Sequence, residues 1–269
     1  MNNASNKSIL WTELDAVLVW LYYVFMSLPW FLNVVFGGGD RTSLNNITEP
    51  VELLPLAFWV FGFTPLAFVC FLIYNRKKQS GCTINQLLHF PSVGTFFVVV
   101  QKGFLCGLCL FFLVAFLLKF WGNYLMTLGV EASPQYLVSV LKEGNIPLWQ
   151  IIGLGGFLGI FAPFCEEFFY RGIIFERLKL HQKKWVAVFL SSLFFAVLHF
   201  NLFALPGVFI AGIGFALVYD MRINAKIDGL EESEKNGLLG SMVAHFTFNM
   251  LNFLITLNFV VKTDVSQLP

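Results

Sequence analysis

Long apolar segments alternate with short polar ones along almost the whole chain. Several approach or exceed the roughly 20 residues that a helix needs to cross a bilayer. They lie at residues 16–36, 52–74, 96–121, 147–170, 185–201, 204–221 and 238–261. The pattern predicts an all-α protein, a polytopic transmembrane helical bundle of about seven to eight spans. The eighth span would come from 123–145, or from the part that follows Glu166, if either also enters the membrane.

Two of these segments carry residues that affect where their helices begin and bend. Gln101 and Lys102 interrupt the third segment, so its membrane part is expected to start near Gly103. Pro163 in the fourth segment has no N–H to donate, and this predicts a kink or break. We expect that helix to continue through Phe175 or beyond, which would bring the polar residues after Pro163 close to the middle of the membrane.

Small residues mark two of the predicted spans as sites of close helix packing. Gly155 and Gly159 form a GxxxG pattern in the fourth, and the sixth contains Gly207, Gly212 and Gly214. Glycine at such spacing lets membrane helices approach closely. We interpret both patterns as packing surfaces.

The loops between the segments differ in their content of Lys and Arg, and this difference predicts the orientation. With a cytoplasmic N-terminus, the cytoplasmic loops receive most of the basic residues, including the run Arg76 to Lys78. That is the distribution the positive-inside rule favours. The first apolar segment is too long for a signal-peptide core, so we expect it to remain as an anchor. The stretch 222–237 is expected to be an exposed cytoplasmic connection.

The composition supports a membrane protein and excludes other classes. The 269 residues are 57% hydrophobic and only 12% charged, with a mean hydropathy of +0.73. Soluble domains are about 25% charged. The net charge is +1 and no basic cluster has the character of a polyanion-binding site, so the sequence indicates no nucleic-acid partner. The lipid bilayer is the environment that this composition requires.

Charged residues within the fourth apolar segment are the first indication of chemistry. Glu166 and Glu167 stand side by side, and Arg171 follows four residues after Glu167. Residues at i and i+4 share a helix face, so Glu167 and Arg171 are predicted to pair. Glu166 is rotated by about 100° from Glu167, and we interpret it as the free carboxylate. Intramembrane charges are costly and usually functional.

Two later apolar segments contribute further polar groups. His199 ends one of them, four residues after Phe195, and His245 and Asn249 lie four residues apart in the last. If these groups converge on Glu166, they form a hydrolytic site. A carboxylate in a low-dielectric pocket can act as general base toward water. A neighbouring imidazole can hold that water, and donors such as His and Asn can stabilise an oxyanion.

Together the three motifs resemble the CPBP (Abi) family, which contains the CAAX prenyl endopeptidases of the Ras-converting type and many bacterial membrane proteases. The resemblance covers about 147–255 and rests on EExxxR, FxxxH and HxxxN on successive apolar segments. It implies a glutamate-activated water, with Glu166 as base and His199 orienting the water. It further implies that His245 and Asn249 are oxyanion donors, that Glu167 and Arg171 support the site, and that no cofactor or metal takes part.

Other functions remain open at this stage. Glu166, His199 and His245 are also ligand types for a catalytic zinc with one open position, although no HExxH is present. A non-catalytic immunity or scaffold protein could retain the same fold. A proton-relaying transporter is a third alternative, but the sequence contains no inverted repeat.

The sequence divides into three parts on this interpretation. Residues 1–125 form N-terminal membrane helices of unassigned role, 126–261 form the catalytic membrane core, and 262–269 form a tail. The expected substrate is a membrane-associated peptide or protein, and the sequence does not identify it or the oligomeric state. A bacterial cell membrane is the favoured location, with a eukaryotic ER membrane as the alternative.

Overall fold

The computed structural model describes residues 11–36, 63–81, 83–88, 90–130, 146–199, 201–227, 230–235 and 237–265. Much of the predicted second span and most of 123–145 lie outside this part of the chain. The described elements, in order along the chain, are α1 (Glu13–Phe36), α4 (Thr64–Ser80), α5 (Ile84–Leu88), α6 (Phe96–Thr127), α8 (Leu148–Gly156), η2 (Phe157–Phe161), α9 (Ala162–Glu167), η3 (Phe168–Phe175), α10 (Glu176–His181), α11 (Lys184–Val197), α12 (Leu205–Asp220), β1 (Arg222–Ile227), β2 (Leu230–Lys235) and α13 (Gly237–Val265).

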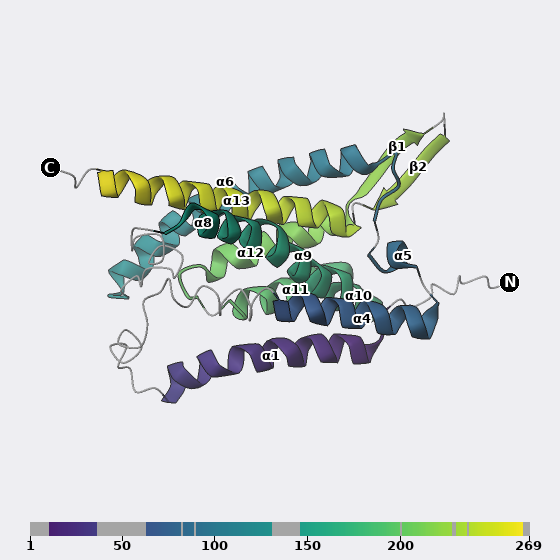
Figure 1. Cartoon of the computed structure of the whole chain (residues 1–269), viewed down its shortest axis with the longest axis horizontal. Helices are drawn as coiled ribbons and strands as arrows, with labels where there is room; N and C mark the ends of the chain where they lie inside the picture. The colour runs from purple at the N-terminus through teal and green to yellow at the C-terminus, as the bar shows by residue number, and fades with distance from the viewer. Residues whose placement is uncertain are drawn as a thin grey trace.

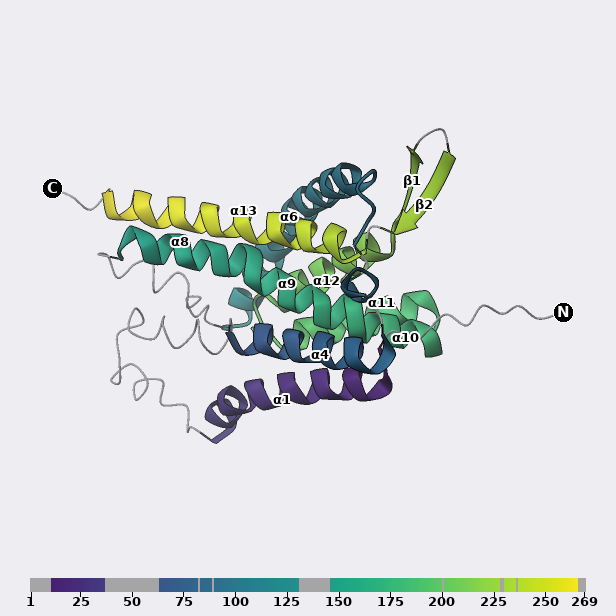
Figure 2. The same ribbon diagram turned by 45° about the vertical axis from the view of Figure 1, so that its right-hand side comes forward.

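The fold is a bundle of long apolar helices, as the hydropathy pattern predicts. Among the residues that the structure describes, three helical stretches are long and apolar enough to cross a membrane: Phe96–Thr127, Leu148–His181 and Gly237–Phe259. Shorter apolar helices cover Lys184–Val197 and Leu205–Asp220. Figures 1 and 2 show α1 and α4 along one side of the bundle and α13 along the opposite side. The chain is therefore an integral membrane protein, while the count of seven to eight spans stays a prediction.

The connection before α13 departs from the all-α expectation. It contains the antiparallel strands β1 and β2, with Arg222 opposite Lys235 and Ile227 opposite Leu230. The hairpin projects beyond the ends of the helices (Figure 1). Asp228 and Gly229 stand between the two strands in the sequence, and Asp-Gly between strands is a strong hairpin signal. The prediction of a plain loop overlooked this signal.

The fourth predicted span is a continuous helical stretch that reaches His181 and is twice widened to π-helix. The first π segment, η2, ends just before Pro163, and the N–H of Ala162 donates to the carbonyl of Phe157, five residues back. The second, η3, directly follows Glu167. The interruption expected at Pro163 thus takes the form of a π-helix, and the expected continuation through Phe175 is confirmed. π-Helices are rare and often occur at functional sites.

A close approach of α6 and α13 depends on two glycines of α6. A Cβ added at Gly103 would lie 2.7 Å from the carbonyl oxygen of Gly240, and one at Gly107 would collide with the carbonyl oxygen of Ala244. Ala244 directly precedes His245 in α13. These glycines therefore help to fix the depth and distance at which α13 presents His245.

Substitution of Gly107 tests this contact. Gly107→Ala should lower the free energy of unfolding by about 1–3 kcal/mol, because the added methyl group overpacks a backbone contact. Gly122→Ala on the same helix is the matched control, since a Cβ there meets nothing within 4 Å. Thermal unfolding of both variants in detergent micelles measures the difference. Equal stability of the two would show that the close approach is unimportant.

The beginning of α1 is fastened to neighbouring helices by both charge and aromatic packing. Arg177 of α10 pairs with Glu13 and donates to the carbonyl of Trp11 at 3.0 Å. The Trp11 ring packs edge-on against Phe168, with centroids 5.2 Å apart. Helix α1 is therefore attached to the same helical stretch that carries Glu166 and Glu167.

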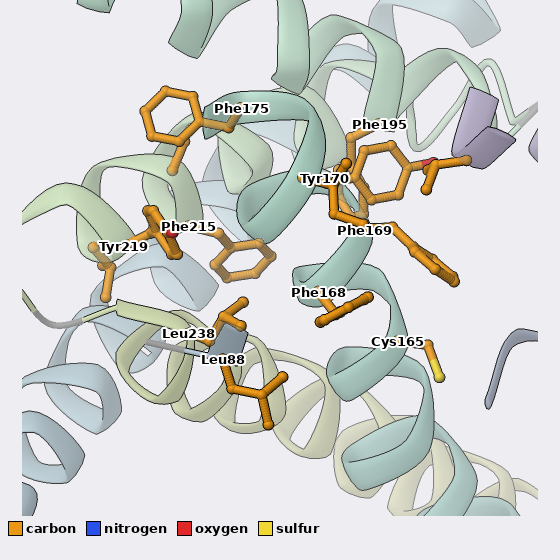
Figure 3. Packing of buried hydrophobic residues seen from close by; sticks show 14 of the residues in the cluster. Leu88, Cys165, Phe168, Phe169, Tyr170, Phe175, Phe195, Phe215, Tyr219 and Leu238 are labelled. Atoms are coloured by element: carbon orange, nitrogen blue, oxygen red, sulfur yellow. The ribbon is translucent and has the colours of Figure 1, made fainter. Parts of the chain in front are cut away.

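Aromatic side chains form the core around that stretch. Phe168, Phe169, Tyr170 and Phe175 are all buried, and Figure 3 shows them along the π-helical part of the chain, with Phe195 beside Tyr170. The Tyr170 and Phe195 rings are 4.9 Å apart. This aromatic core holds the stretch 166–175 against its neighbouring helices.

Candidate active site

The adjacent carboxylates Glu166 and Glu167 have different surroundings. The Glu167 side chain is 0% exposed and its Oε1 accepts from Arg171 Nη1 at 2.9 Å. The Arg171 side chain is likewise 0% exposed and also donates to the carbonyl of Gly212 in α12 at 3.0 Å. The Glu166 side chain is 25% exposed. The ion pair expected between Glu167 and Arg171 is present, and Glu166 is the partly exposed carboxylate of the two.

Two aromatic rings complete the surroundings of Arg171. Its guanidinium lies 4.6 Å from the Phe195 ring centroid and 5.4 Å from that of Phe215. Cations are attracted to the faces of aromatic rings. The sequence motif FxxxH includes Phe195, but nothing in the sequence indicated Phe215 or the Gly212 carbonyl as partners of Arg171.

His245 joins the two carboxylates. Its Nδ1 is 2.8 Å from Glu167 Oε1, and its Nε2 is 3.8 Å from Glu166 Oε2. An ionised carboxylate only accepts hydrogen bonds, so Nδ1 carries the proton donated to Glu167. In the neutral ring Nε2 is then an acceptor, and it becomes a donor only in the imidazolium. The separation of 3.8 Å is too long for a hydrogen bond and is one at which a bridging water should be considered.

Aromatic rings also fix the plane of the His245 imidazole. The ring is stacked on Phe215 at 4.5 Å between centroids, with an interplanar angle of 19°. Phe195 packs edge-on against it at 5.9 Å. Phe215 therefore contacts both His245 and Arg171, and it is a residue of the site that the sequence analysis missed.

His199 lies at the end of the neighbouring helix α11. Its Nδ1 is 2.7 Å from the carbonyl oxygen of Phe195, and the two rings are 4.7 Å apart. A carbonyl oxygen only accepts, so Nδ1 is the donor and Nε2 of the neutral ring is free to accept. The ring is exposed at its outer side. This tautomer suits an imidazole that holds a water molecule.

The hairpin of helices α10 and α11 predicts that His199 lies near the level of Glu166. Tyr170 packs against Phe195 across this hairpin. Glu166 lies four residues before Tyr170, and His199 lies four residues after Phe195. Each is therefore four residues further from the turn between α10 and α11 than the ring that marks its helix. The helical stretch that carries Glu166 extends to His181, so Glu166 lies well inside this stretch and not at its end.

Asn249 is engaged with the backbone of the widened helix. Its Nδ2 donates to the carbonyl of Leu158 at 2.9 Å. In a π-helix this carbonyl would accept from the residue five positions later, which is Pro163 and has no N–H. Asn249 thus satisfies an acceptor that Pro163 leaves free. One N–H of the amide remains for another partner.

A groove lies apart from these residues. It has a volume of about 370 Å³ and runs between α1, α10 and α11, with Glu13, Trp20, Arg177 and His181 among its lining residues. None of the predicted site residues lines this groove.

The zinc alternative finds no ligand set in the part of the chain that the structure describes. There, no three His, Cys, Asp or Glu side chains are grouped so that they could hold a metal ion. The nearest approach to such a set is His245 with its two carboxylates, and one of these already pairs with Arg171.

Comparison with known families identifies the region that carries these residues. Residues 147–251 match the model of a family described as Rce1-like, the type II CAAX prenyl endopeptidases. This segment of the chain is similar to the CAAX protease family. The Rce1-like segment contains all three motifs on which the resemblance was based, and it indicates a membrane endopeptidase of the CAAX protease type. No curated protein and no solved structure gave a match to the chain.

Proposed function

We propose that the protein is an intramembrane endopeptidase that cleaves a membrane-associated peptide or protein with a water molecule activated by Glu166. The observation that carries the proposal is the arrangement around His245. This imidazole is held by the buried Glu167 and presents Nε2 to the partly exposed Glu166 at 3.8 Å. The two carboxylates thereby acquire different roles, one structural and one available for chemistry.

In this mechanism Glu166 accepts a proton from water while the resulting hydroxide forms a bond to the scissile carbonyl carbon. The carbonyl electrons move to oxygen and give a tetrahedral oxyanion. His199 Nε2, an acceptor in the tautomer that the contact between Nδ1 and the Phe195 carbonyl implies, holds the water. Collapse of the intermediate breaks the C–N bond, and the proton held by Glu166 passes to the leaving nitrogen. One peptide and one water yield a carboxylic acid and an amine.

His245 and the remaining N–H of Asn249 are the oxyanion donors in this proposal. The bond from His245 Nδ1 to Glu167 means that Nε2 can donate only when the ring is doubly protonated. Oxyanion donors typically contribute about 3–4 kcal/mol to transition-state stabilisation.

A comparison of membrane peptides tests the proposal and identifies the substrate. Membranes from cells that produce the protein and from cells that lack it would be compared by mass spectrometry for new peptide termini. We expect at least one cleavage that requires the protein and stops in the Glu166→Gln variant. Glu176→Gln, a carboxylate that pairs with Lys179 further along the same helical stretch, is the matched control. An unchanged peptide pattern, or cleavage by Glu166→Gln, would contradict the proposal.

Removal of metal separates this mechanism from the zinc alternative. The peptide identified above, resynthesised with a fluorophore and a quencher, serves as a reporter of cleavage by the purified protein. We expect its cleavage rate to be unchanged after dialysis against a chelator, because a carboxylate base needs no metal to activate water. A loss of activity that added zinc restores would favour the metalloprotease.

A further inference from the structure

Helix α12 carries none of the three sequence motifs, yet it places two groups against the buried ion pair of the site. The Gly212 carbonyl accepts from Arg171 Nη2 at 3.0 Å. Phe215 follows three residues later on the same face of the helix, and its ring centroid is 5.4 Å from the Arg171 guanidinium. Phe215 is 1% exposed and belongs to the core drawn in Figure 3. Helix α12 therefore reaches the interior of the candidate active site.

The Phe215 ring also covers one face of the His245 imidazole. The two rings are stacked, with 4.5 Å between centroids and an interplanar angle of 19°. Phe195 contacts the same imidazole at 5.9 Å and nearly at a right angle. Stacked and edge-on arrangements are the contacts that aromatic rings prefer. The plane of the imidazole thus follows the plane of the Phe215 ring.

The two residues that contact Phe215 donate to the same oxygen atom. Arg171 Nη1 and His245 Nδ1 lie 2.9 Å and 2.8 Å from Oε1 of Glu167. Hydrogen bonds weaken when the donor departs from a nearly linear approach. Two donors on one acceptor therefore each need a defined direction. A rigid ring that lies against both of them restricts the directions that they can take.

The hydrogen bond at Nδ1 does not by itself fix the direction in which Nε2 of His245 points. It holds one atom of the ring, and the imidazole could still tilt about the axis of that bond. A tilt would redirect Nε2, which lies 3.8 Å from Glu166 Oε2. It would also break the nearly parallel contact with Phe215. The stacked ring thus opposes the movement that the hydrogen bond allows.

We propose that Phe215 is a positioning residue of the active site, which directs Nε2 of His245 toward Glu166 and the reacting peptide by fixing the plane of the imidazole. The inference rests on the proposed function, since it assigns a role in presenting an oxyanion donor. Phe215 lies within the Rce1-like segment, residues 147–251, but outside all three motifs. Helix α12 thereby takes part in catalysis as well as in packing.

Phe215→Leu tests the assignment, because leucine is buried as readily but has no flat ring to place against His245. We expect kcat for the reporter peptide to fall about 10- to 100-fold, the loss that follows when a reacting group is displaced by up to about 1 Å. KM should stay within about twofold, since the buried ring acts on the imidazole and is not placed to contact bound peptide.

Phe175→Leu is the matched control for the loss of a buried ring. Phe175 is 0% exposed and packs edge-on against Tyr219, also in α12, with 5.9 Å between centroids. This variant should lower the unfolding temperature about as much as Phe215→Leu does, while its kcat stays within about twofold of the wild type. A merely structural role of Phe215 would make the two variants alike in kcat, and that result would overturn the inference.

Phe215→Tyr restores the flat ring and should recover at least about half of the wild-type kcat. Equal losses of kcat in Phe215→Leu and Phe215→Tyr, or a raised KM with wild-type kcat, would contradict a role in orienting His245. If Phe215→Leu does not fold, Phe215→Met takes its place in these comparisons.

Glu166→Gln is assayed in parallel to separate the inference from the function on which it rests. An inactive Glu166→Gln together with a fully active Phe215→Leu would refute the role of Phe215 and leave the proposed function standing. An active Glu166→Gln would refute that function itself.

Discussion

Glu166→Gln should lower kcat for the reporter peptide by at least about 10²- to 10⁴-fold, the range that general bases contribute. Glutamine has nearly the same shape but cannot accept the proton from water. The protein should remain folded, because Glu166 is partly exposed and its carboxylate is not part of the buried ion pair. KM should change little, since the mutation removes an interaction needed mainly in the transition state.

Two controls make this result specific. Glu176→Gln should keep wild-type kcat. Glu176 pairs with Lys179, with 3.3 Å between Nζ and Oε1, and is not one of the residues that contact His199 or His245. Thermal unfolding of Glu166→Gln should match that of the wild type. A Glu166→Gln enzyme with more than about a tenth of the wild-type kcat would be incompatible with a role as general base.

Arg171→Met should lower the free energy of unfolding by about 3–5 kcal/mol, because it leaves Glu167 buried without its cation. Both side chains are fully buried, and Arg171 also bonds to Gly212. The substitution would also disturb the position of His245, since the Glu167 oxygen that pairs with Arg171 also accepts a hydrogen bond from His245 Nδ1. Chemical unfolding in detergent, followed by circular dichroism, measures the change.

An exposed ion pair provides the comparison for Arg171→Met. Lys184 is paired with Asp220 at 2.9 Å and its side chain is 47% exposed. Lys184→Met should cost at most about 1 kcal/mol, as is typical of pairs near solvent. If Arg171→Met were as mild as Lys184→Met, the pair with Glu167 would not be the structural support that the geometry indicates.

The pairing of Glu167 with Arg171 could be predicted from the sequence because it depends on local helix geometry. The four-residue spacing of Glu167 and Arg171 fixes a shared helix face, and the structure contains their ion pair. The bond between Glu167 and His245 joins residues 78 positions apart. Such a contact depends on how whole helices dock, and no local pattern in this sequence encodes it.

The extent of the carboxylate-bearing helix was harder to predict because hydropathy treats every charged residue as exposed. The segment was cut near residue 170 at the point where Arg171 enters the sequence. In the structure Arg171 and Arg177 are buried with partners, and the helical stretch runs to His181. The paired charges thus permit a longer buried helix than a window of mean hydropathy allows.

The sequence motifs also could not predict which residues of the helices outside them, such as α1 and α6, pack against the motif-bearing helices. Gly103 and Gly107 repeat the four-residue spacing noted elsewhere, but only the packing of α6 on α13 shows which face they serve. Tyr23 stands in an apolar, aromatic-rich helix in which nothing distinguishes it from Tyr22. Its proximity to Tyr170 appears only once α1 is placed in space.

The proposed hydrolytic mechanism requires that Glu166 and His199 act on the same water molecule. A double-mutant cycle with Glu166→Gln and His199→Phe, measured as kcat for the reporter peptide, tests this most directly, because residues that act as a unit show strongly non-additive losses. We predict that the double variant is no slower than the slower of the two single variants. Losses that multiply, as for two independent sites, would contradict a shared catalytic centre.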